Sequence, residues 1–200
     1  AGKKVKIQAV VTSLKDAYKF VLSRSRKVPV DTFFNKHEGF RRTVYELAKN
    51  DPNLKINFVK NVEGKMPEEL VFDSNLQKAE YLKSFDAPIG QKTAIDNFQK
   101  ALNGMPEAKK SYLTTYSPVE LSKMKLFTTK DGKAGYAIKG SDELVNLFNY
   151  GERGRSINLT VEAIKNGARR LDCVGDPLRV YYEDLGFKVD KIVKWNDKYA

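Results

Sequence analysis

Residues 144–187 read LVNLFNYGERGRSINLTVEAIKNGARRLDCVGDPLRVYYEDLGF, and this stretch decides the fold that we expect. It opens with an apolar run at 144–148, typical of a buried strand, and passes through a turn rich in glycine and arginine at 151–155. A helical pattern over about 156–166, a second predicted strand at 170–174 and a second helical pattern over about 177–185 follow. This order predicts a right-handed crossover unit, in which ligands bind at the carboxyl ends of the parallel strands.

The turn at 151–155 has the chemistry of an anion site. It precedes a helix whose first amides have no partners within the helix and lie at the positive end of its dipole. Arg153 and Arg155 add two guanidinium groups. The sequence therefore predicts a phosphate or pyrophosphate site at Arg153, Gly154, Arg155 and Ser156. The alternative is a surface turn with its arginines in water.

Two segments of this stretch resemble the GNAT superfamily of N-acetyltransferases. The loop Gly151-Glu-Arg-Gly154-Arg-Ser156 is similar to the family's pyrophosphate loop, Arg/Gln-x-x-Gly-x-Gly/Ala, except that Gly151 replaces the basic or amide residue, for which Arg153 can substitute. Tyr181-Tyr182-Glu-Asp-Leu-Gly186-Phe187 resembles the family's Phe-Tyr-x-x-x-Gly-Phe segment. The resemblance covers about residues 112–195 and extends to GNAT-like domains of bacteriophage proteins.

The resemblance implies a cofactor, acetyl-CoA, and roles for several residues. Tyr182 would protonate the departing thiolate, and the strand before the loop, at Leu147, Phe148 and Asn149, would bind the pantetheine arm through its main chain. Glu143 is a candidate base that relays a proton through water. The alternatives are an aromatic side chain packed on the sheet for Tyr182 and a solvated acid for Glu143.

The remaining patterns predict an α+β fold, a GNAT-like mixed sheet with flanking helices after a mainly helical, basic N-terminal region. We expect the N-terminal region at 1–110, with a strand at 3–12 and helices at about 13–27, 31–50, 74–85 and 93–102. The GNAT-like domain at 111–200 would contain strands at 112–116 and 187–195 and a hairpin at Asp131-Gly132.

Positive charge is concentrated at the front of the chain. The net charge is +11, and the first 30 residues hold eight Lys or Arg and a single Asp, a net charge of +7. Such a segment attracts nucleic acid in a salt-dependent way. The alternative is a solvated, lysine-rich surface that aids solubility.

Composition excludes several classes of site. One Cys allows no internal disulfide and fits a reducing compartment, and we expect Cys173 to be buried in a strand. With one His and one Cys we predict no metal site, and His37 lacks the partners of a catalytic base. No apolar run is long enough to cross a membrane, so we expect a cytoplasmic protein, in the host cytoplasm if a phage encodes it.

Two functions follow from these expectations. The favoured one is an acetyl-CoA-dependent N-acyltransferase that acts on a protein or another macromolecular amine, because a basic module precedes the coenzyme-binding half. The alternative is a catalytically inactive, phage-type protein whose basic region binds nucleic acid or another phage component. The acceptor and the oligomeric state stay open.

Overall fold

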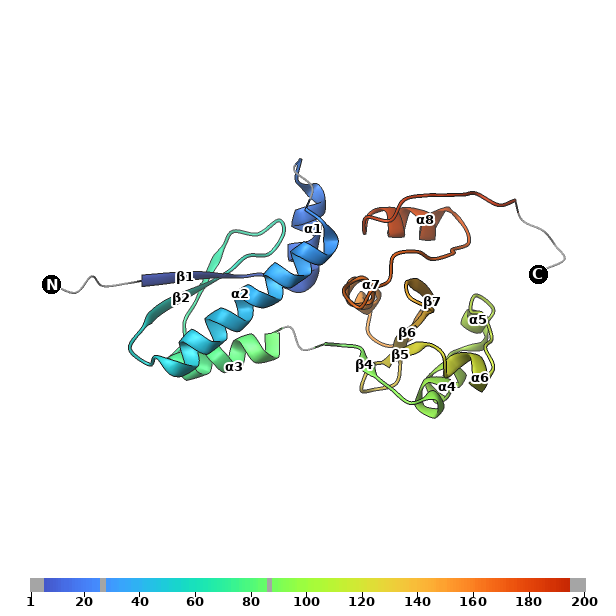
Figure 1. The fold of residues 1–200 in the computed structure, drawn as a ribbon, viewed down its shortest axis with the longest axis horizontal. Coiled ribbons are helices and arrows are strands. Elements are labelled where there is room, and N and C mark those ends of the chain that lie inside the picture. The colour runs from blue at the N-terminus through green and yellow to red at the C-terminus, as the bar shows by residue number, and fades with distance from the viewer. Residues whose placement is uncertain (1–5, 26–27, 86–87, 195–200) are drawn as a thin grey trace.

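The computed structural model describes residues 6–25, 28–85 and 88–194. The chain folds into two β-sheets, each covered by helices, which confirms the predicted α+β class (Figure 1). The first sheet lies in the N-terminal part of the chain and the second in the C-terminal part.

The first sheet contains three strands, β1 (Lys6–Val11), β2 (Lys55–Lys60) and β3 (Glu68–Leu70). β2 pairs in parallel with β1 and antiparallel with β3. Alternate residues of β1 and β2 point to one face, where they pack against α2 (Val30–Asn50) and α3 (Asn75–Phe85) around a core of Ala9, Val11, Ile56, Phe58, Val44, Ala48, Ala79 and Leu82. This region is therefore less purely helical than expected.

The helices of this region follow the predicted pattern closely. α1 (Leu14–Ser23) starts after Ser13, whose side chain accepts a hydrogen bond from the Asp16 amide at 3.1 Å, as an N-cap residue does. α2 runs without a break through Gly39 and stops at Asn50, just before Asp51. Residues 68–70 form β3 because they pair with β2.

The second sheet is antiparallel, in the order β4 (Gln91–Lys92), β5 (Lys125–Thr128), β6 (Ala134–Lys139) and β7 (Glu143–Asn149). The hairpin predicted at Asp131-Gly132 is confirmed, with Gly132 at φ 65° in the turn. α7 (Arg155–Lys165) covers one face, and α4 (Ile95–Asn103) with the short α5 (Glu107–Lys110) and α6 (Pro118–Leu121) covers the other. The residues expected in the N-terminal region thus divide between the two sheets, because α4 packs on the second.

Three predicted strands are wrong. Residues 112–116 are irregular, because the main chain of Thr114 bonds to a side chain rather than to a strand. Residues 170–174 make a single bridge to β7 before Gly175, at φ 85°, leads into α8 (Asp176–Glu183), so Cys173 is exposed rather than buried. Residues 187–194 form no strand, and Trp195 lies outside the described residues.

The two parts of the molecule meet at α7. Three aromatic residues of α1 and α2, Tyr18, Phe33 and Phe34, pack against Val161 and Ile164 of α7 and against Leu185, which follows α8. An ion pair from Lys165 to Glu38, at 3.2 Å, crosses the same contact. Within the described residues, no helix is both long and apolar enough to span a membrane.

Candidate functional site

Strand β7 has a bulge in its middle. Against β6 its register shifts, since Val145 opposes Ala137 while Phe148 opposes Gly135, so β7 contains one extra residue. Asn146 sits in this extra stretch with φ 48°, a left-handed conformation that Asn tolerates better than most residues. Its buried side-chain amide accepts from the Thr114 amide at 3.2 Å and donates to the Thr114 carbonyl at 2.9 Å.

The outer edge of β7 is almost unpaired. At its start the Leu144 amide donates to the Arg170 carbonyl at 2.8 Å, and Glu143 bridges Arg170 in parallel. Beyond Leu144, no main-chain hydrogen bond joins β7 to residues 171–174 in the described chain. This is the edge at which the sequence predicts a full parallel strand, and a row of main-chain groups therefore stays available there.

The loop after β7 holds itself in shape. The Asn149 side chain accepts from the Gly151 amide at 3.1 Å and donates to the Glu152 carbonyl at 2.8 Å. Gly154 then caps α7 with φ 83°, and a Cβ atom added to it would meet no atom within 4 Å. In the described chain the amides of Gly154, Ser156 and Ile157 donate to no acceptor, so the helix begins with free donors beside an open position.

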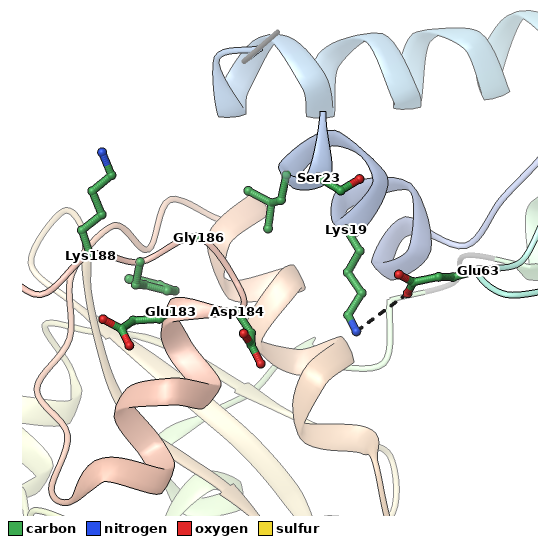
Figure 2. A pocket seen from close by; sticks show the side chains of 9 residues that line it. Lys19, Ser23, Glu63, Glu183, Asp184, Gly186 and Lys188 are labelled. Carbon is green, nitrogen blue, oxygen red and sulfur yellow. Dashed lines mark ion pairs between the residues drawn. The ribbon is translucent and has the colours of Figure 1, made fainter. Parts of the chain in front are cut away.

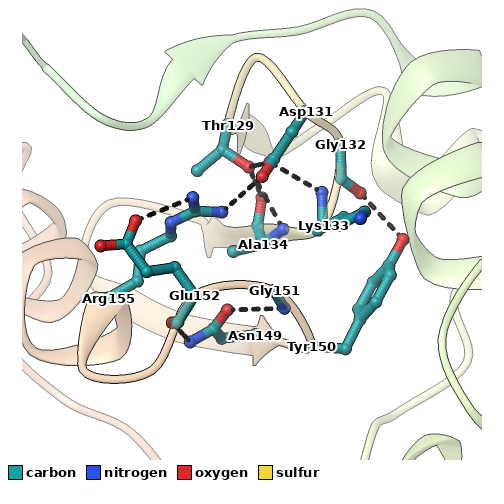
Figure 3. Close-up of polar contacts among 10 residues, drawn as sticks. All are labelled: Thr129, Asp131, Gly132, Lys133, Ala134, Asn149, Tyr150, Gly151, Glu152 and Arg155. Atoms are coloured by element: carbon teal, nitrogen blue, oxygen red, sulfur yellow. Dashed lines mark hydrogen bonds and ion pairs between the residues drawn. The ribbon is translucent and has the colours of Figure 1, made fainter.

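The two predicted arginines differ in their surroundings, and Figure 3 shows those of Arg155. Arg155 is largely buried and donates to the Asp131 carboxylate at 2.8 Å and to Glu152 at 3.2 Å. The hydrogen bond from the Thr129 hydroxyl, and then the Arg155 guanidinium, hold the pKa of Asp131 well below its usual range. Arg153 is exposed and makes no ion pair with any described residue. The free guanidinium of the loop is therefore Arg153.

The two tyrosines of α8 point to different surroundings. The Tyr181 hydroxyl lies 2.8 Å from the Thr160 hydroxyl on α7, so Tyr181 is tied to that helix. Tyr182 is partly buried against the core cluster between the sheet and α7, as Leu147 and Leu171 are, and its ring contacts Phe187 at 5.7 Å between centroids. Burial raises the pKa of Tyr182 above 10, and its hydroxyl makes no hydrogen bond in the described chain. It is a protonated donor without an acceptor.

Two other residues predicted for the site, Phe148 and Glu143, are engaged in contacts within the protein. Phe148 is buried on the opposite face of the sheet, where its ring contacts Phe98 at 5.8 Å. Glu143 pairs with Arg170 at 3.5 Å at the end of β7 farthest from the loop. The structure thus brings Leu147 and Tyr182 to one side of the sheet and the loop residues to one end of β7, while the Glu143 carboxylate is engaged elsewhere.

Two hollows lie near these elements. One of about 320 Å³ is bordered by Asp131 and Arg155 and by Pro88, Ile89 and Gln91. A larger one, of about 670 Å³, lies between α1 and the end of α8 (Figure 2). Both basic and acidic side chains border it, among them Lys19 and Glu63, which form an ion pair at 4.0 Å. Leu22 and Phe187 are its apolar walls. Among the described residues no three His, Cys, Asp or Glu side chains are grouped to hold a metal ion.

We compared the chain with protein-family models, with curated proteins and with solved structures, and no match was found in any of the three.

Sequence reasoning missed two residues that shape this site. It identifies Asp131 only as a turn residue, and nothing in the local pattern signals its contact with Arg155, 24 positions later. It assigns no role to Asn146, although an Asn inside an apolar strand is a weak hint of a left-handed bulge residue.

Proposed function

We propose that this protein is an acyl-CoA-dependent N-acyltransferase, with acetyl-CoA as donor and an amine of a macromolecule as acceptor. The observation that carries the proposal is the geometry of β7: a bulged strand whose outer edge is unpaired runs into an open, glycine-capped helix start. The resemblance of the loop and of the Tyr-Tyr segment to GNAT enzymes supports the same function.

The residues present fit the coenzyme. A diphosphate would accept from the free amides of Ser156 and Ile157, with Arg153 as the available cation. Gly154 leaves room for a phosphate to approach the main chain. The unpaired main chain beyond Leu144 supplies donors and acceptors for the amide groups of a pantetheine arm.

Acyl transfer requires few groups from the protein. Held by the amides of Ser156 and Ile157 and by Arg153, acetyl-CoA would supply an activated acyl carbon; a C–N bond to the neutral amine would replace the C–S bond, and the amine would lose a proton to solvent or a base. Tyr182 would donate its proton to the departing sulfur and regain one from solvent, since a tyrosine hydroxyl is protonated at neutral pH; burial, which raises its pKa, makes it a weaker acid than an exposed tyrosine. Glu143 is the candidate base that would act through water once its Arg170 partner releases it.

A thermal-shift series tests the proposal. Acetyl-CoA at about ten times its Kd should raise the melting temperature by roughly 3 °C or more, because a ligand of the native state adds RT ln(1 + [L]/Kd) to its stability. Gly154→Trp should abolish the shift, whereas Gly64→Trp, at a second exposed glycine with positive φ and open space, should keep it.

The competing function predicts another pattern. No shift at millimolar acetyl-CoA, together with DNA or RNA binding that weakens steeply with salt, would replace the transferase by the inactive, nucleic-acid-binding alternative. Two basic residues of α1 already have acidic partners, Lys15 with Asp16 at 3.8 Å and Lys19 with Glu63 at 4.0 Å. Most of the charge proposed to bind nucleic acid lies in or next to residues outside the described ranges.

A further inference from the structure

The β5–β6 turn lies against the loop that follows β7. The Tyr150 amide donates to the Lys133 carbonyl at 2.9 Å, and the Tyr150 hydroxyl donates to the carbonyl of Gly132 or Ala101, at 3.0 and 2.9 Å. A Cβ atom on Gly151 would lie 3.0 Å from Lys133 Cβ and 3.1 Å from an Arg155 nitrogen. The turn, the loop and the Arg155 head group therefore form one closely packed unit.

Asp131 is the centre of this unit. One carboxylate oxygen accepts from the Thr129 hydroxyl and, at 3.1 Å, from the Lys133 amide, while the other accepts from Arg155 at 2.8 Å. The turn thus holds the carboxylate, and the carboxylate holds the arginine (Figure 3). Because Arg155 also reaches Glu152, it links the turn to the middle of the loop.

We propose that Asp131 is a positioning residue for the anion site: it fixes Arg155, which fixes the loop at 151–154, and so leaves Arg153 as the cation that meets a diphosphate. This inference rests on the proposed function. It gives the two arginines of the loop different roles, structural for Arg155 and ligand-binding for Arg153, although they lie two positions apart in the sequence.

The sign of the effect separates positioning from simple electrostatics. Asp131→Asn removes a negative charge near a site for anions, so an electrostatic effect alone would tighten binding of CoA and of inorganic pyrophosphate. Positioning predicts the reverse, because a loop that must be ordered on binding loses affinity. We expect Asp131→Asn to weaken both ligands at least fivefold.

The experiment measures two quantities in the same variants. Calorimetry gives the affinities for CoA and pyrophosphate, and hydrogen exchange gives the protection of amides 150–157 in the free protein. Asp131→Asn and Arg155→Gln should each speed exchange and weaken binding, and the double variant should be no weaker than the worse single one. Arg153→Gln should weaken binding and reduce its salt dependence without changing exchange. Asp176→Asn, which removes a similar pair with Arg179 at 3.1 Å on α8, is the matched control and should change neither quantity.

Three results would overturn the inference. Unchanged exchange in Asp131→Asn would show that the carboxylate does not hold the loop. Faster exchange with equal or tighter binding would show that loop order does not matter for the ligand. Wild-type protein that binds neither CoA nor pyrophosphate would remove the proposed function as well, and this outcome is recognised from the wild type alone.

Discussion

The two edges of β7 are built differently. The inner edge pairs with β6 from Glu143 to Asn149, interrupted only by the bulge, whereas the outer edge bonds to the chain at Leu144 and then stops. In an ordinary parallel crossover both edges would be satisfied by neighbouring strands. The inner edge therefore holds the fold together, and the outer edge is where the proposed coenzyme would bind.

The bulge connects the two edges. An extra residue in a strand bends it and interrupts its ladder, so Asn146 alters the course of β7 where the outer edge becomes free. A left-handed, non-glycine residue costs free energy, which here is offset by two hydrogen bonds from its side chain to the Thr114 main chain. Such local strain is common at functional sites.

The largest effect is expected from a substitution on the inner edge. Gly135 faces Phe148 in β7, and a Cβ atom on it would lie 2.4 Å from the Phe127 carbonyl oxygen. Gly135→Ala should therefore destabilise the protein by about 3 kcal/mol in denaturant unfolding. Gly39→Ala, at an open helical position, is the control and should be neutral or stabilising; an equal effect of both would contradict the packing of this edge.

A slightly smaller free-energy effect, on the catalytic rate, is expected for a substitution beside the outer edge of β7. Tyr182→Phe should lower kcat about 100-fold, or about 2.7 kcal/mol of activation free energy, with unchanged acetyl-CoA affinity, because only proton donation is lost. Tyr181→Phe is the matched variant: it removes the hydrogen bond with Thr160 and should cost about 1 kcal/mol of stability without changing kcat. Equal activity of Tyr182→Phe and wild type would remove Tyr182 from the mechanism.

The side chain that supports the bulge can be removed. Asn146→Ala leaves the Thr114 amide and carbonyl without partners and keeps the left-handed strain, so we expect a loss of about 2 kcal/mol in unfolding free energy. Acetyl-CoA affinity should fall too, because the outer edge changes course. Asn146→Gly relieves the strain and should lose less stability; if Asn146→Ala keeps full affinity, the bulge does not shape the coenzyme site.

The smallest effect lies away from β7. Burial, followed by the charge of Arg41, lowers the pKa of His37, whose ring packs on Phe33. The folded state therefore binds a proton less tightly than the unfolded chain, so His37 contributes stability above pH 6.5 that is lost as the pH falls through its lower folded-state pKa. His37→Gln should reduce the pH dependence of stability between pH 7.5 and 5, measured by thermal unfolding, and should leave coenzyme binding unchanged. An identical pH dependence in both proteins would contradict this burial.

Local signals in the sequence predict well the elements that are defined by contacts within a few residues. The Asp131-Gly132 turn, for example, is defined by contacts within a few residues, and the strands on either side of it pair as expected. The strand-like segments at 112–116 and 170–174 mislead, because strand formation needs a partner and the partner is not encoded locally. Thr114 bonds to Asn146 instead, and residues 171–174 leave β7 after a single bridge.

The candidate site shows the same division. Gly154 and the helix behind it could be predicted, because a glycine at a helix start and the free amides beyond it are local features. The different surroundings of Arg153 and Arg155 could not, since they depend on the distant Asp131.

Mapping acetyl-CoA onto the main chain tests the central claim most directly. Hydrogen exchange or amide chemical shifts should be measured for wild-type protein with and without acetyl-CoA. We predict that the coenzyme protects amides on the free edge of β7, at 145–149, and at the start of α7, at 153–157, with little change along β5 and β6. Binding that leaves these amides unchanged and protects others, such as those lining the groove between α1 and α8, would contradict the account.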